Sequence, residues 1–308
     1  MPAAIAKDYC LTIIVFLLAT FVAAVPAPPR ALGAEVAGAD AVGTVAWLED
    51  YSKAQERAIA EGKMLLVYFR ADEENAHRVR FERETLRDEK ILQILQKFIT
   101  VRLPLDAAIM VAGERVRLLE DAAFAPLGGQ AGLAVVDFRH PKSEHYRKLV
   151  GYLPFEKAAY YVAAYESKHS VTTLLTLPAG SLRGRMMIYA VRMHPERPAS
   201  TDGQRHPVLV DACGSHCTHQ AKLGRQGHHL WEDRFQEIWK ATGGVAPVEI
   251  CAESWPGKSL IVACLDCVDA WHHSSGHWNA VRDSHPAYGY DIRRGTNGIW
   301  YATGLFGG

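Results

Sequence analysis

The apolar positions of residues 45–168 alternate between a helical period and a strand period. From Trp47 to Glu61 they recur about every 3.6 residues, which predicts a helix that ends at Gly62. Residues 64–69 form a continuous apolar run, which is typical of a buried strand. The same patterns predict further strands over 98–105, 133–138 and 144–152 and further helices over 86–98 and 155–165. Strands that alternate with helices predict an α/β layered domain.

The pattern changes after residue 168. Residues 169–206 are rich in Thr, Gly and Pro and predict a linker with one strand, over residues 186–193. Apolar residues at helical spacing then predict one helix from Pro207 and another over residues 260–271. Residues 288–293 and 299–306 flank the sequence Gly-Thr-Asn-Gly, which favours a hairpin turn. Residues 207–308 are therefore expected to form a second domain, with an α+β arrangement and a small antiparallel sheet.

The N-terminus has the features of an export signal. Residues 11–25 are apolar, Lys7 precedes them, and Val22-Ala23-Ala24 fits a cleavage site. A run of about fifteen residues is short for a bilayer span, which needs roughly twenty. We interpret residues 1–34 as a signal peptide and lead-in, with an uncleaved anchor as the alternative. The mature protein is then secreted, periplasmic or attached to the cell envelope, without a stable membrane span.

Charge and cysteine content narrow the functional classes. The 34 basic and 34 acidic residues balance, which gives no electrostatic case for binding nucleic acid. Five of the six cysteines follow the signal, all of them after residue 212. Cys213 and Cys217 share one face of a predicted helix and are expected to be buried apolar residues. Cys251, Cys264 and Cys267 are candidates for a disulfide. Two alternatives are that the Cys264-x-x-Cys267 pair supplies two of the four ligands of a zinc site, or that these cysteines are simply packed in the core.

Residues 45–168 resemble the thioredoxin-like family. The resemblance rests on Lys63 followed by the apolar strand that ends at Phe69, a helix, and the apolar strand over 133–138. In that family the redox cysteines begin five residues after this Phe, where the present chain has Glu74 and His77. Thiol exchange needs a thiolate and a resolving thiol, so we expect a redox-inactive module. Glu74 and His77 are interpreted as a charged helix end, with a metal or acid–base pair as the alternative.

Residues 207–308 resemble a compact bacterial CAP domain, the superfamily of cysteine-rich secretory proteins, antigen 5 and pathogenesis-related class 1 proteins. A first helix leads to a His and then an Arg, and the chain closes on an aromatic strand ending in Phe306-Gly307. The matching segments are His228 or His229 with Arg234, Ala252-Glu253-Ser254 for the family's Gly-Glu-Asn, and Trp271-x-x-Ser274-Ser275-Gly276-His277-Trp278 for its Trp-x-x-Ser-Pro-Gly-His-Arg.

The resemblance implies an αβα sandwich with a cleft lined by His and Glu. Carried over by position, the cleft residues are Glu253 and His277 with either His228 or His229, and the family's second Glu has no counterpart. The supporting residues are Arg234, Ser254 and Trp271. Two imidazoles and a carboxylate, His228, Glu253 and His277, have the composition of a zinc or other divalent metal site. His216 and His219 are expected on the solvated surface of the first helix.

Three functions follow from these patterns. The leading hypothesis is a non-enzymatic binding module whose cleft holds a divalent metal, a small or lipid ligand, or a protein partner. A secreted metal-dependent hydrolase that uses the same His/Glu cleft is the alternative, although no catalytic nucleophile is evident. The third is a structural cell-envelope assembly factor in which neither module has a working cleft.

Overall fold

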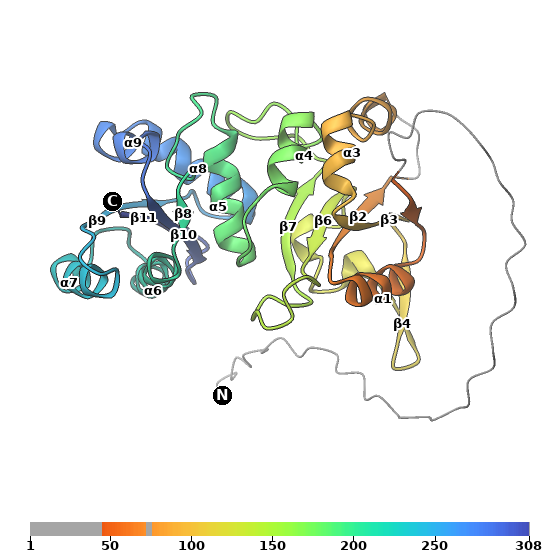
Figure 1. The fold of residues 1–308 in the computed structure, drawn as a ribbon, viewed down its shortest axis with the longest axis horizontal. Helices are drawn as coiled ribbons and strands as arrows, with labels where there is room; N and C mark the ends of the chain where they lie inside the picture. Colours follow the sequence, from red (N-terminus) through yellow and green to blue (C-terminus); the bar gives the residue numbers. More distant parts are fainter. Residues whose placement is uncertain (1–44, 72–75, 308) are drawn as a thin grey trace, which may run out of the picture. The chain divides into compact units, whose positions relative to one another are not determined.

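The computed structural model describes residues 45–71 and 76–307 (Figure 1). The predicted signal peptide and Glu74 therefore lie outside the described residues. Within the described ranges no helix combines the length and apolar character needed to cross a membrane. The chain has mixed α/β structure with several sheets, which confirms the class expected from the sequence.

The first sheet has five strands in the order β1-β3-β2-β6-β7. β2 is parallel to β3 and antiparallel to β6, and β6 is antiparallel to β7. The strands are β1 (Trp47–Leu48), β2 (Met64–Arg70), β3 (Phe98–Pro104), β6 (Gly132–Val136) and β7 (Leu149–Pro154). Strand β2 is buried through its central five residues, which explains its unbroken apolar sequence. A separate small hairpin joins β4 (Ala108–Val111) to β5 (Glu114–Arg117).

Helix α1 (Tyr51–Glu61), which belongs to the same part of the chain as the first sheet, begins and ends at capping residues. The helix begins where the Asp50 side chain accepts a 3.1 Å hydrogen bond from the Lys53 N–H. It ends at Gly62, whose φ of 59° is costly for other residues. Trp47, which the periodicity assigns to this helix, belongs instead to β1. The other helical segments before β6 are α2 (Ala76–Arg80), a π-helical turn over Phe81–Thr85, α3 (Glu89–Leu95), and two 3-10 helices, Leu118–Glu120 and Ala125–Leu127.

The second sheet has four strands in the order β8-β10-β11-β9. β10 and β11 form the predicted hairpin, and β9 pairs antiparallel with β11. The turn places Gly298 at a φ of 79°, in the region that favours glycine. The strands are β8 (Gln204–Arg205), β9 (Pro247–Glu253), β10 (Ala287–Arg294) and β11 (Trp300–Gly307).

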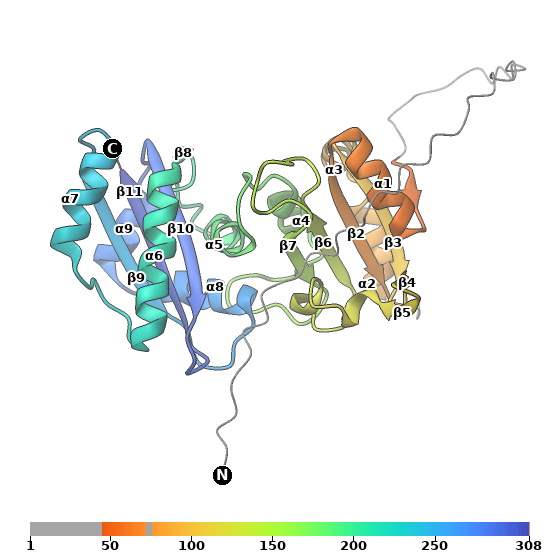
Figure 2. The same ribbon diagram turned by 90° about the horizontal axis from the view of Figure 1, so that it is seen from below.

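Helices cover both faces of the second sheet (Figure 2). One face packs α6 (Pro207–Leu223) and α7 (Trp231–Ala241), with a small apolar cluster around Leu209 and Leu305. The other packs α5 (Leu182–Met193), α8 (Leu260–His272) and α9 (Ser275–Arg282). Alternate residues of each strand point to opposite faces, so β9 sends Glu249 and Cys251 toward α6 and Ile250 toward the main core.

The predicted strand over residues 186–193 is wrong, because this segment is the C-terminal part of α5. The Ser181 hydroxyl caps the helix by accepting a 3.1 Å hydrogen bond from the Gly184 N–H. Nine of its twelve residues are buried, since the helix packs against β7, β10 and α8. A helix that is apolar on nearly all sides has no amphipathic period by which the sequence could distinguish it from a strand.

Residues 155–165 do not form the predicted helix. They form a series of turns and bends, in which Val162 and Tyr165 are buried in the core. The helix begins later, as α4 (Lys168–Leu175), where the Ser167 hydroxyl accepts from the Ser170 N–H. The segment 169–206 is thus two helices and the short strand β8 rather than a linker.

The two sheets share one apolar core, which passes from β2 and β6 through α5 to α8 and β10. Polar contacts also cross between the halves. The Tyr152 hydroxyl on β7 accepts a 3.1 Å hydrogen bond from the Ile261 N–H in α8. On α5, the buried Arg185 guanidinium donates to three carbonyl oxygens, at Val150, Leu177 and Pro178. Residues 45–307 therefore pack as one unit.

Candidate metal centre

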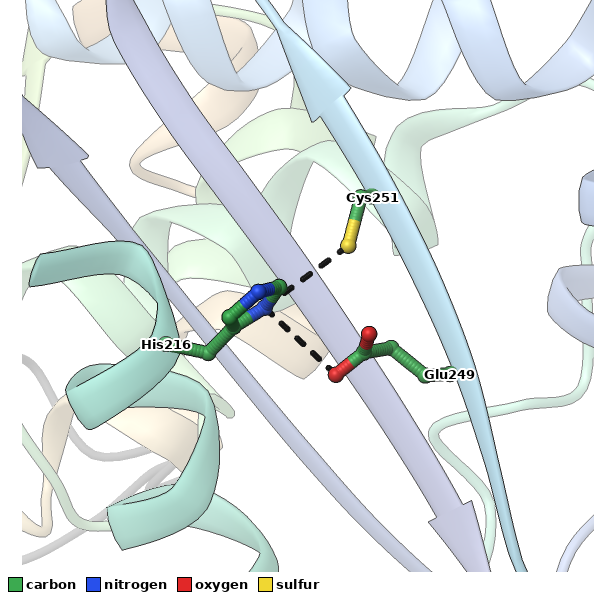
Figure 3. A group of neighbouring side chains, drawn as sticks. All are labelled: His216, Glu249 and Cys251. Atoms are coloured by element: carbon green, nitrogen blue, oxygen red, sulfur yellow. Dashed lines mark hydrogen bonds and ion pairs between the residues drawn. The ribbon is translucent and has the colours of Figure 1, made fainter. Parts of the chain in front are cut away.

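Three metal-binding side chains meet between α6 and the second sheet. His216 comes from α6, and Glu249 and Cys251 come from β9 (Figure 3). One ligand atom from each lies within 4.8 Å of the other two, and all three residues are buried. His216 Nδ1 lies 3.4 Å from Glu249 Oε2 and 3.8 Å from Cys251 Sγ.

Local sequence explains why these side chains converge. Residues two apart on a strand share a face, so Glu249 and Cys251 both point from β9 toward α6. On α6, His216 follows Leu209 by seven residues and Cys213 by three, which places it on the buried face of the helix. The prediction that His216 is solvated was wrong for this reason: only 1% of its side chain is exposed.

Glu249 is a buried carboxylate held by hydrogen bonds from two neighbouring side chains. Arg234 on α7 binds it with both terminal nitrogens, at 2.5 and 2.7 Å. The His228 Nδ1–H donates to Oε1 at 2.9 Å, since a carboxylate can only accept. Burial alone would raise the pKa of Glu249, but the hydrogen bonds from His228 and Arg234 outweigh it and lower the pKa. Glu249 is therefore ionised at neutral pH.

His216 is neutral at physiological pH. Burial lowers its pKa to about 4, against the opposing attraction of Glu249. Its Nδ1 faces Glu249, Cys251 and the Thr303 hydroxyl, the last at 3.2 Å. Its Nε2 is buried without a hydrogen-bond partner in the described structure. A neutral imidazole with a lone pair among oxygen and sulfur ligands is the form that binds a metal.

The geometry does not suit Cys251 as a catalytic nucleophile. In a Cys–His–carboxylate triad the two imidazole nitrogens have different partners, one for the thiol and one for the carboxylate. Here Nδ1 of His216 faces both groups. Burial also raises the pKa of the Cys251 thiol, so it stays protonated.

Two of the three separations are close to those between neighbouring ligands of a tetrahedral metal ion. Ligand atoms at the usual zinc distances would lie about 3.4 Å apart for an N–O pair and about 3.6 Å apart for an N–S pair. The observed separations from His216 Nδ1 are 3.4 Å to Glu249 and 3.8 Å to Cys251. The ligand atoms of the third pair, Glu249 and Cys251, lie within 4.8 Å of each other.

The residues predicted to line the cleft lie around this centre but do not form it. His228 contacts Glu249, and its Nδ1 is 3.8 Å from Cys251 Sγ. His229 Nε2 lies 3.2 Å from the Arg225 carbonyl oxygen instead. The His277 ring on α9 is 6.2 Å from the His228 ring, and burial lowers its pKa. Glu253 is exposed and accepts a hydrogen bond from the Gln226 N–H.

The supporting residues have separate roles. Arg234 belongs to the centre through its pairing with Glu249. The buried Ser254 hydroxyl accepts from the Trp300 N–H at 3.1 Å and fixes the end of β9 against β11. Trp271 is buried in the main core beside Tyr290, on the other face of the sheet. His77 is exposed and pairs with Glu166 at 3.6 Å.

Sequence reasoning did not single out Glu249, and it considered Cys251 only as a disulfide, zinc or packing residue. The sequence feature that could have indicated this cluster is Glu249-x-Cys251, because residues two apart on a strand place their side chains on the same face. The Ala252-Glu253-Ser254 match pointed to Glu253, which is exposed and lies four residues beyond the buried Glu249.

The five described cysteines are free thiols, so the disulfide prediction for Cys251, Cys264 and Cys267 is wrong. Cys251 lies on the α6 face of the sheet, whereas Cys264 and Cys267 lie in α8 on the other face. Within α8, Cys264 and Cys267 lie about one turn apart and are both free thiols. The prediction that Cys213 and Cys217 are buried is confirmed.

We expect these five thiols to be unreactive in the native protein and reactive after unfolding. Burial raises the pKa of each, which suppresses the thiolate that attacks alkylating reagents. Iodoacetamide labelling followed by peptide mapping checks this. The labelling is done in the absence of reductant, once on the native protein and once in guanidinium. Any of the five that stays unlabelled after unfolding would show a disulfide that the structure lacks.

Comparisons with known proteins add little to this geometry. No protein-family model matches the chain, and no curated protein matches it. Among solved structures, a similar chain is an outer surface protein from Borrelia burgdorferi, at 21% identity and a TM-score of 0.29. The match covers 34% of this chain and 76% of that one. A TM-score this low supports no argument about fold or function.

Proposed function

We propose that this chain is an exported, non-enzymatic binding protein whose C-terminal part is a CAP-type module that holds a divalent metal ion. The metal ligands are His216, Glu249 and Cys251, and zinc is the ion that best suits mixed nitrogen, oxygen and sulfur ligands. The first half is a thioredoxin-like module without the redox pair, for contact with a partner. The strand order β1-β3-β2-β6-β7 and the lack of cysteine between residues 45 and 168 support that assignment.

One observation carries the proposal: three buried ligand atoms of different kinds lie within 4.8 Å of one another. His228 and Arg234 would orient the Glu249 carboxylate by hydrogen-bonding to it from outside the coordination sphere. The Arg234 charge would also weaken the attraction of the site for a dication, so we expect moderate rather than extreme affinity. The buried thiol and the paired carboxylate favour binding over hydrolysis.

The test compares two buried cysteines. Zinc content of the purified protein is measured in wild type, Cys251→Ala and Cys264→Ala, since both residues are buried and only Cys251 is near His216. We expect about one zinc per chain in wild type and Cys264→Ala, and at least a hundredfold weaker binding in Cys251→Ala. Mutation of a residue that only supports a metal ligand already weakens binding by about 10–100-fold, so loss of a ligand should cost at least the upper end of that range.

Proton release provides a second readout. Because the Cys251 thiol is protonated and His216 is neutral, zinc binding should release about one proton near pH 7 to 8. Affinity should then rise about tenfold per pH unit over that range. If wild type binds no zinc at micromolar concentration, or Cys264→Ala loses zinc while Cys251→Ala keeps it, the proposed centre is wrong.

A further inference from the structure

A second candidate site lies away from the metal centre, in a cavity of about 1030 Å³. It is bordered by the ends of α6 and β10, the starts of α5 and α8, and residues 122–128, which include the 3-10 helix Ala125–Leu127. Five of its lining residues are cationic and none is acidic: Arg183, Lys222, Lys258, Arg293 and Arg294. The chain as a whole has equal numbers of acidic and basic residues, so this is a local excess of positive charge.

The positive charge of the cavity is only partly neutralised. Asp291 is shared by two guanidinium groups: Arg293 Nη2 lies 2.8 Å from Oδ2, and Arg183 Nε lies 3.6 Å from Oδ1. The Nε atoms of both arginines are buried without a hydrogen-bond partner in the described structure. Within the described residues Lys222, Lys258 and Arg294 form no ion pair. Two of the five cationic residues thus share one carboxylate, and the other three have no ion pair among the described residues.

Two further features of the cavity bear on its ligand. Helix α8 starts at the cavity wall, with Ser259 as N-cap and Leu260 in the lining, so the positive end of its dipole adds to the side-chain charge. The remaining wall is largely apolar and aromatic. Its apolar and aromatic residues are Ala122, Ala125, Pro126, Tyr152, Leu182, Ala221, Leu260 and Trp300.

We propose that this cavity binds an organic phosphate whose phosphate group is attached to an apolar moiety. Guanidinium and ammonium groups that approach from several elements suit the three charged oxygens of a phosphate monoester. The cavity is several times larger than a phosphate group, and its apolar wall would cover the attached moiety. The same chemistry is found in an acidic lipid headgroup and in a soluble aryl or alkyl phosphate.

Isothermal titration of the full chain with three probes tests this proposal. The probes are inorganic phosphate, phenyl phosphate and dihexanoyl phosphatidic acid, below its micelle concentration. Both organic probes should bind at least tenfold more tightly than inorganic phosphate, because only they occupy the apolar wall. Tighter binding of the lipid identifies a lipid source, and equal binding identifies a soluble organic phosphate. Equal affinity for all three probes, or no binding at millimolar concentration, would overturn the proposal.

Charge reversal locates the site. The double variant Lys222→Glu/Lys258→Glu should weaken binding of the organic probe by roughly a hundredfold, at about tenfold per charged contact. The matched control Lys90→Glu/Lys240→Glu makes the same change in net charge at two exposed lysines outside the cavity and should leave the affinity within about threefold. If the control weakens binding as much as the cavity variant, binding follows net charge and the cavity is not the site.

Discussion

Replacing Arg234 with alanine is expected to destabilise the protein by about 3–5 kcal/mol at neutral pH. The change leaves the Glu249 carboxylate, whose side chain is only 1% exposed, without its bidentate partner. A buried charge that loses its partner keeps its full desolvation penalty, which is why the expected cost exceeds that of a surface ion pair. Urea denaturation at pH 7 measures the effect, and the melting temperature should fall on the order of 10 °C.

The pH dependence of this loss distinguishes an unpaired charge from simple loss of packing. In wild type the pKa of Glu249 is lowered on folding, so its contribution to stability is present above the unfolded pKa of about 4.3 and is lost as the pH falls through the folded value. Without Arg234 that lowering weakens, and protonation then relieves the buried charge. The difference between wild type and Arg234→Ala should therefore be largest at pH 7 and shrink below about pH 4.

Two variants serve as controls for Arg234→Ala. Arg282→Ala, at an exposed arginine of α9, should change stability by less than about 0.5 kcal/mol. Adding Glu249→Gln to Arg234→Ala should recover part of the lost stability, because it removes the unpaired charge. If the double variant is as unstable as the sum of the two single variants, Arg234 and Glu249 act independently and this account of the pair is wrong.

Replacing Arg185 with methionine is expected to cost about 3–5 kcal/mol and to shift the unfolding of both halves together. Burial lowers the pKa of this guanidinium to about 10, and it donates hydrogen bonds to the carbonyl oxygens of Val150, Leu177 and Pro178. Methionine keeps much of the volume but leaves two buried carbonyl groups and one half-buried carbonyl group without these donors. Each charge-assisted bond is worth about 1.5–3 kcal/mol, offset by the cost of burying the charge.

Urea unfolding, followed by circular dichroism and by tryptophan fluorescence, measures this effect. Because one core joins the two sheets, we expect a single transition that moves to lower urea with an unchanged slope. Arg115→Met, at an exposed position of the β4–β5 hairpin, is the matched control and should leave the midpoint nearly unchanged. Two separate transitions, of which Arg185→Met moves only one, would show that the halves unfold as independent domains.

Elements with a clear local period could be predicted from the sequence. The strands β2, β3 and β6 and the helices α6 and α8 were predicted nearly at their observed bounds, because each carries an unbroken apolar run or an amphipathic repeat. The β10–β11 hairpin was predicted from its Gly-Thr-Asn-Gly turn. Helix α5 was mistaken for a strand because its sides are buried by two different sheets, which removes the polar face that defines a helical period.

The sequence by itself determined the class of the fold, the main strands and helices, the burial of Cys213 and Cys217, and the gathering of imidazoles and carboxylates in the last hundred residues. Only the tertiary structure decided which of them meet. Glu249 and Glu253 share one face of β9, yet only Glu249 is buried, against His216 of α6 and Arg234 of α7, whereas Glu253 ends the strand and is exposed. His216 and Cys251 are 35 residues apart and touch only because α6 lies across the sheet face. Such contacts depend on how elements pack, and no local pattern encodes that packing.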